Sequence, residues 1–310
     1  MKTKTLLHSL VKITLIAFII HAEVNCCLAQ QKAQFTQYMF NGLVLNPAMA
    51  GIENAPSVTF INKIQWARVD GAPTTQTLSA STRIPHSNAG VGITFVNDKI
   101  GVHNNQYLQA SFAYHLPITE KSFLSLGLQA GADFYKSNYA SIAGNQNIDP
   151  GLNNMSYAAF IMGVGILYKS SKFEGGISAP SIIPHQFAYD DSLRVHWGQA
   201  HYFSFLRYHF KLNNALELQP SVLIKYLKGT PLSFDINAAL VIKQVLTLAL
   251  AYRKAESIDF LMTANVTPNL QLGVAYDYGI GEVSLNSGGS FELMAKYMFR
   301  TPTNKISSPR

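Results

Sequence analysis

The sequence predicts an all-β protein, a transmembrane outer-membrane β-barrel of about 14 antiparallel strands with a short N-terminal plug or periplasmic segment. Apolar and polar residues alternate along most of the chain. Charged residues make up only 13% of it, about half the usual share for soluble domains. No segment beyond the N-terminal 29 residues has the roughly 20 apolar residues of a transmembrane helix. Because every second barrel residue faces lipid, low charge without long apolar runs is the pattern expected of a barrel.

Residues 1–29 have the pattern of a cleaved signal peptide. Three lysines flank or precede the apolar run LIAFII, and the small residues Cys27 and Ala29 suit cleavage before Gln30. A lipoprotein site at Cys26 or Cys27 is the alternative, but the residues ahead of them lack the usual Leu-small-small approach. Cleavage removes both cysteines, which excludes thiol chemistry from the exported protein. It also removes three lysines and one glutamate, so the formal net charge falls from +7 to +5.

Residues 58–300 are predicted to form the barrel, because apolar residues recur at every second position, as in LQLGVAYDY at 270–278. A soluble β-sandwich alternates equally well, but its strands average about five or six residues, and strands of ten or more recur here. The predicted strands lie near 58–66, 75–84, 89–97, 106–116, 122–135, 157–168, 172–179, 199–211, 214–227, 231–242, 245–253, 256–266, 269–278 and 289–300. Residues 301–310 follow as a tail.

The predicted connections alternate in length. Short turns at 170–172, 213–215 and 267–269 follow even-numbered strands, whereas long connections at 137–156, 180–198 and 279–288 follow odd-numbered ones. Short periplasmic turns, long outer loops and an even strand count are typical of outer-membrane barrels. Both chain ends are then expected on the periplasmic, short-turn side.

Aromatic residues on the apolar face are predicted to form girdles at the lipid headgroup level, because ring-plus-hydroxyl side chains prefer that depth. They occur near the ends of predicted strands. The candidate girdle residues are Tyr114, Tyr168, Tyr226, Tyr252, Tyr276, Tyr278, Tyr297 and Phe299.

The sequence contains no catalytic or cofactor-binding motif of the GxSxG, HExxH, GxxxxGK[ST] or CxxC type. His201 and His209 would lie about 27 Å apart on one strand, too far for a shared metal. Charged residues with inward parity carry both signs, so they are expected to pair within the lumen. The sequence therefore predicts no enzyme, no cofactor and no metal site. The small positive net charge is not concentrated in a run of Lys and Arg residues before the tail, which argues against nucleic acid as a partner.

Residues 30–57 precede the first strand and include QFTQYMFNGLVLNPAMAG at 34–51. Asn46 can cap a turn with its side chain, Pro47 fixes φ, and Gly51 permits a positive φ. The apolar residues here need burial, either as a plug in the barrel mouth or as a periplasmic lead-in under the rim. Asn46-Pro47-Ala48 is similar to an element in the N-terminal hatch of fatty-acid-transport barrels. The candidate plug or partner-docking residues are Phe35, Tyr38, Phe40, Asn46, Pro47, Ala48 and Gly51.

Several motifs in order resemble the PorP/SprF family of type IX secretion system membrane proteins. They are QFTQYMFN, LNPAMAG, Gln65-Trp66, DGAPTTQTLSA, GVGITFVNDKIG, YHLPI and LSLGLQAG, and the similarity continues to the last strand. The resemblance implies a barrel in the outer membrane of a Gram-negative bacterium that supports export or surface anchoring of proteins with C-terminal sorting domains, in some members gliding adhesins. It implies as partners outer-membrane lipids, periplasmic ring components and the secreted cargo, and it supplies no catalytic residues.

Two other functions stay open at this stage. A diffusion channel or hydrophobic-solute transporter would have the same strand count and would show conductance. An outer-membrane hydrolase would need a paired Ser and His on the lipid face. Histidines are scarce on that face, because His115, His201 and His209 have inward parity. Cargo specificity is expected in the loops at 137–156 and 180–198.

Overall fold

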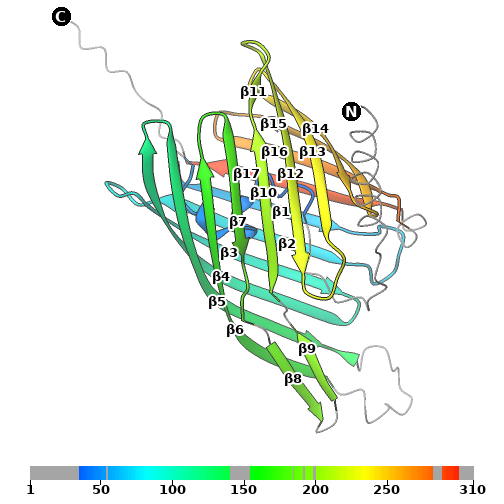
Figure 1. Ribbon diagram of the computed structural model, residues 1–310. Helices are drawn as coiled ribbons and strands as arrows, with labels where there is room; N and C mark the ends of the chain where they lie inside the picture. Colours follow the sequence, from blue (N-terminus) through cyan, green and yellow to red (C-terminus); the bar gives the residue numbers. More distant parts are fainter. Residues whose placement is uncertain are drawn as a thin grey trace, which may run out of the picture.

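The computed structural model describes residues 35–53, 55–139, 154–183, 185–190, 193–197, 200–281 and 288–299, which form a closed antiparallel barrel (Figure 1). The predicted signal peptide, the tail, and most of the loop at 137–156 lie outside the described residues. Among the described residues, no helix is long and apolar enough to cross a membrane.

The elements are bounded as follows: 3₁₀ helices η1 (Gly42–Val44) and η2 (Pro47–Met49), then β1 (Ser57–Ile64), β2 (Thr74–Arg83), β3 (Ala89–Ile100), β4 (His103–Thr119), β5 (Ser122–Ser137), β6 (Met155–Lys169), β7 (Phe173–Ala179), β8 (His185–Asp190), β9 (Leu193–Trp197), β10 (His201–Tyr208), β11 (Phe210–Lys211), β12 (Leu216–Leu227), β13 (Ser233–Ile242), β14 (Leu246–Arg253), β15 (Ser257–Asn265), β16 (Leu270–Gly279) and β17 (Ser290–Met298).

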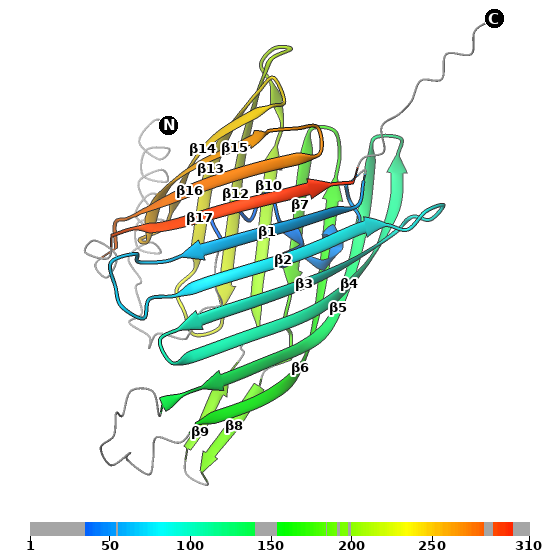
Figure 2. The ribbon, with the colours of Figure 1, turned by 180° about the vertical axis from the view of Figure 1, so that it is seen from behind.

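Fourteen of these strands close the barrel, as predicted. Neighbours along the chain pair as antiparallel hairpins, and β10 pairs with both β7 and β12. The first and last strands also pair, with Ser57 opposite Met298, so β1 lies between β2 and β17 (Figure 2). The predicted strand at 199–211 is divided into β10 and β11, both of which pair with β12. The ribbon of β8 and β9 belongs to the connection between β7 and β10 and forms a separate sheet.

The alternation seen in the sequence separates the two faces of the wall. On β5, Leu126 and Leu128 face outward with 46% and 59% of their surface exposed, whereas Ser125 and Gln129 face the lumen at 0% and 3%. Outward apolar side chains on an otherwise closed sheet are the arrangement that a lipid bilayer requires.

The two rims of the barrel differ in their connections. Lys169 and Phe173 are joined by the short turn at 170–172, at the rim where β1 begins and β17 ends; this rim is called the short-turn rim below. The opposite, long-loop rim carries the connections from β5 to β6, β7 to β10 and β16 to β17. Strands β4, β5 and β6 are the longest, with 17, 16 and 15 residues. β4 continues beyond its pairing with β3 at the short-turn rim, whereas β6 continues beyond its pairing with β7 toward the long-loop rim.

Candidate functional site

The segment Phe35–Glu53, called the plug below, lies inside the barrel. Phe35 packs with Ile61, Val96 and Ile161, about half-way along their strands or closer to the long-loop rim. The chain then runs toward the short-turn rim, where Gly51 lies against the start of β3. The first barrel strand therefore begins, and the last one ends, at the short-turn rim; the two chain ends lie outside the described residues.

Local sequence determines the turn at the centre of the plug. The Asn46 side chain caps η2 by accepting a hydrogen bond from the Ala48 amide at 2.9 Å, and Pro47 occupies the first helical position. Gly51 has φ of +70°, a conformation that disfavours any residue with a Cβ. As the sequence predicts, Asn46 caps the turn with its side chain and Gly51 has a positive φ.

Glycines in the wall let the plug approach the strands at backbone distance. A Cβ added at Gly127 of β5 would lie 2.1 Å from the Ala48 nitrogen. One added at Gly165 of β6 would collide with the Asn46 side-chain oxygen, and one at Gly90 of β3 with the Ala50 carbonyl. A wall without side chains at these points explains how Asn46 and Ala48 reach 0% exposure.

Serines beside these glycines bind the plug backbone. Ser125 donates to the Ala48 carbonyl and Ser178 to the Leu45 carbonyl, both at 2.7 Å. Ser81 accepts from the Gly51 amide at 2.7 Å. The Asn46 amide nitrogen also donates to the Ile166 carbonyl of β6 at 3.1 Å. These bonds satisfy backbone groups that would otherwise be buried without partners.

The deep end of the plug is held by charged residues from the opposite wall. Glu292 accepts from the amides of Thr36 and Gln37 at 2.6 and 3.0 Å. Lys63 lies 3.1 Å from the Glu292 carboxylate and 2.9 Å from that of Asp277. Glu292 and Lys63 are almost fully buried, and their mutual pairing offsets the cost of removing charges from water. The Glu292 carboxylate therefore fixes the plug at Thr36 and Gln37.

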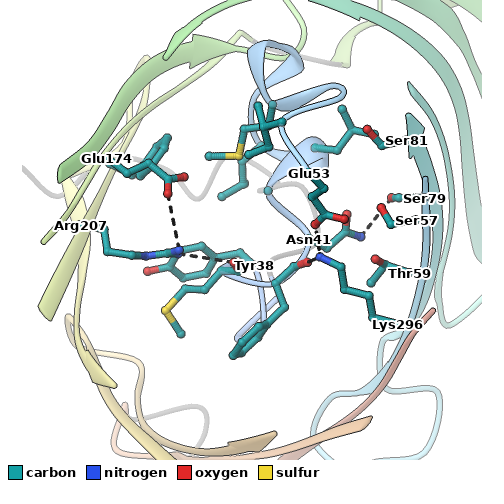
Figure 3. Close-up of a pocket in the computed structure, with 18 of the residues that line it drawn as sticks. Tyr38, Asn41, Glu53, Ser57, Thr59, Ser79, Ser81, Glu174, Arg207 and Lys296 are labelled. Carbon is teal, nitrogen blue, oxygen red and sulfur yellow. Dashed lines mark hydrogen bonds and ion pairs between the residues drawn. The ribbon is translucent and has the colours of Figure 1, made fainter. Parts of the chain in front are cut away.

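A cavity of about 210 Å³ lies between the plug and the wall near the short-turn rim (Figure 3). Apolar plug residues form part of its lining, and Lys296 bonds both Glu53 and the Phe40 carbonyl of the plug. Arg207 faces it from β10, 4.0 Å from the Glu174 carboxylate. Small hydroxyl side chains complete the lining: Ser57, Thr59, Ser79 and Ser81.

The structure brings all seven candidate plug residues together in the lumen. Phe35, Tyr38, Asn46, Pro47, Ala48 and Gly51 are buried, and Phe40 is half-buried beside the cavity. The sequence predicted that charged residues with inward parity pair within the lumen, but it did not connect Glu292, Asp277 and Lys63 with the plug. Their contacts join residues more than 200 positions apart, which no local pattern reveals.

The candidate girdle residues all face outward, in two groups. Four lie toward the short-turn rim: Tyr114, Tyr168, Tyr297 and Phe299. Four lie toward the long-loop rim: Tyr226, Tyr252, Tyr276 and Tyr278. Their role as membrane anchors stays a prediction.

The described residues contain no cluster of three or more His, Cys, Asp or Glu side chains able to hold a metal ion. His115 and His201 point into the lumen, where each is buried. His209 pairs with Glu217 at 2.8 Å, close to the short-turn rim.

Comparison with known proteins identifies one family, described as "Type IX secretion system membrane protein PorP/SprF", which matches residues 27–297. Among curated proteins, none matches the chain significantly. Solved structures with similar barrels include the outer membrane protein Omp33 of Acinetobacter baumannii, with 9% identity, a TM-score of 0.49, and coverage of 80% of this chain and 100% of that one. The toluene transporter TbuX of Ralstonia pickettii has 9% identity, a TM-score of 0.49, and coverages of 83% and 93%. A FadL homologue of Pseudomonas aeruginosa has 12% identity, a TM-score of 0.43, and coverages of 83% and 94%.

Proposed function

The chain belongs to the PorP/SprF family of type IX secretion system membrane proteins, and we propose that it serves in the outer membrane as a plugged docking barrel of that system. In this role it supports export or surface anchoring of proteins with C-terminal sorting domains, gliding adhesins among the candidates. Its partners are outer-membrane lipids, periplasmic ring components and the cargo.

The plug is the observation that carries this proposal. A transport channel needs a continuous path, whereas this lumen is crossed by a segment bonded to both walls, by Glu292 on one side and Ser125 and Ser178 on the other. Each such bond is worth about 0.5–1.5 kcal/mol, or more where a charged group takes part. A segment fixed in this way presents a constant surface at the short-turn rim, which suits docking.

Orientation follows from the loop lengths. Short turns are typical of the periplasmic side of outer-membrane barrels, so the plug base and the short turns would face the periplasmic components. The long connections at 137–156 and 180–198 would face outward, where cargo specificity is expected.

Co-purification tests the proposal. A tagged barrel is purified from its own cells, and the lipoprotein among the periplasmic ring components, called the ring lipoprotein below, is detected in the eluate. Deleting residues 34–51 should abolish that co-purification while the barrel still shows heat-modifiable migration in detergent gels, a sign of a folded barrel. A folded deletion variant that retains the lipoprotein would overturn the docking role of the plug.

The solute-channel alternative makes a different prediction. Purified protein in planar bilayers should then conduct or pass apolar solutes with the plug in place. The docking proposal expects no conductance from the intact chain and the appearance of conductance in the variant lacking residues 34–51.

A further inference from the structure

The cavity at the short-turn mouth has a size that restricts its occupant. Its volume is about 210 Å³, below the roughly 300–1,000 Å³ of pockets that hold drug-sized ligands. A space of this size suits one large side chain. Pockets that receive a single anchoring side chain are the usual centres of binding energy in protein interfaces.

The lining has an apolar side that such an anchor could contact. Tyr38, Met39 and Met49 of the plug and Phe205 of β10 border the cavity. Tyr38 and Phe205 belong to one buried cluster, and Met39 and Met49 pack against it. Methionine side chains adapt to irregular partners, so this side can close around an inserted group.

The charges around the cavity are unequal. Three cations, Lys169, Arg207 and Lys296, face two carboxylates, Glu53 and Glu174. Lys296 is closely paired with Glu53. Glu174 is shared over longer distances, 3.7 Å from Lys169 and 4.0 Å from Arg207. The Arg207 guanidinium also donates to the Met39 carbonyl of the plug at 3.5 Å. With five N–H groups it still keeps donors for a further carboxylate, and guanidinium groups bind carboxylates in a bidentate manner.

We propose that this cavity receives a peptide segment of a periplasmic type IX secretion component, with one large apolar side chain inserted beside Met39 and Met49 and a neighbouring Asp or Glu on Arg207. The inference rests on the proposed function, which supplies the side from which the partner comes. Charge complementarity and the location at the short-turn rim select an acidic, apolar-anchored peptide.

Two variants with matched controls test the cavity. Thr59→Phe places a ring in the cavity, because Thr59 lines it, whereas Val58→Phe adds the same ring to the outward face of β1. Arg207→Gln removes the proposed carboxylate partner, whereas Lys211→Gln removes an exposed cation close to the same rim that lies outside the cavity lining. Thr59→Phe and Arg207→Gln should each weaken co-purification of the ring lipoprotein about tenfold or more, as for a central anchor, and both controls should retain it.

Photo-crosslinking identifies the occupant. A photoreactive p-benzoylphenylalanine replaces Ile52, a half-buried apolar residue of the lining, and the crosslinked peptide is sequenced by mass spectrometry. The expected product joins Ile52 to a ring-component peptide with an aromatic or large aliphatic residue next to Asp or Glu.

The outcomes separate the two proposals. If folded Thr59→Phe and Arg207→Gln barrels retain the lipoprotein as well as their controls do, or if Ile52 crosslinks to residues 300–310 of this chain, the cavity proposal is wrong and the docking function stands. If the lipoprotein fails to co-purify even with the unaltered barrel, the proposed function fails and the cavity proposal fails with it.

Discussion

Replacing Gly127 by alanine should loosen the plug without altering the outer surface of the barrel. The added Cβ would lie 2.1 Å from the Ala48 nitrogen, whereas ordinary contact begins at 3.4 Å, so plug and wall must separate by about 1.3 Å. Overpacking of this kind costs about 1–3 kcal/mol. The same displacement would break the 2.7 Å bond from Ser125 to the Ala48 carbonyl, for a further ~1 kcal/mol. A total near 3 kcal/mol lowers the ratio of docked to released plug about a hundredfold.

Hydrogen exchange measures that ratio directly. Peptides covering residues 35–53 should exchange slowly in the unaltered protein and up to about a hundredfold faster in Gly127→Ala. Gly175→Ala is the control, because its Cβ meets only the ends of the Leu206 and Phe173 side chains, 2.8 and 3.0 Å away. Equal plug exchange in Gly127→Ala, Gly175→Ala and the unaltered protein would refute the close-packed docking of the plug on β5.

Three further substitutions test the plug turn, the buried lumenal charges and the lipid-facing surface. Asn46→Ala removes both the η2 cap and the bond to Ile166 and should destabilise the protein by about 1–3 kcal/mol; the drop in the thermal midpoint of heat-modifiable migration should exceed that of Asn213→Ala, an exposed turn cap. Lys63→Met leaves the buried Asp277 and Glu292 carboxylates without their lysine and should cost about 3–5 kcal/mol in urea unfolding from vesicles, and an unchanged midpoint would contradict the pairing. Leu128→Arg places a charge on the outward face in the middle of β5 and should lower the free energy of unfolding from vesicles by about 2–4 kcal/mol, whereas Leu212→Arg near the rim should lower it by about 0–1 kcal/mol. Equal losses in the two variants would argue against a membrane around β5.

The sequence was sufficient for features that depend on neighbouring residues. The period of two fixed which residues face outward and located fourteen strands, because alternation in each strand is a local signal. Asn46, Pro47 and Gly51 likewise predicted their turn, since capping and positive φ depend on a few adjacent residues. The end of β1 at Ile64 came two residues earlier than expected, and Trp66 beyond it adopts a φ of +51°.

The docking of the plug depended on contacts that sequence distance conceals. The bond from Thr36 to Glu292 spans 256 positions, and a mixed set of lumenal charges has many equivalent pairings until the fold selects among them. Gly127 was one of several small inward residues, and nothing nearby marked it as the one that touches Ala48. The cavity at the short-turn rim arises from the plug and from β1, β2, β6, β7, β10 and β17 together, so its shape appears only once all seven are assembled.

Quantitative proteomics of the cell surface and culture medium tests whether this barrel serves type IX secretion. A clean deletion strain is compared with the same strain carrying the intact gene or the gene lacking the codons for residues 34–51. We expect that one or a few sorting-domain proteins disappear from the exterior on deletion, return with the intact gene, and stay absent with the plug-deleted form. An exported set that is the same in the deletion strain and its complemented parent would contradict a role in type IX secretion for this barrel.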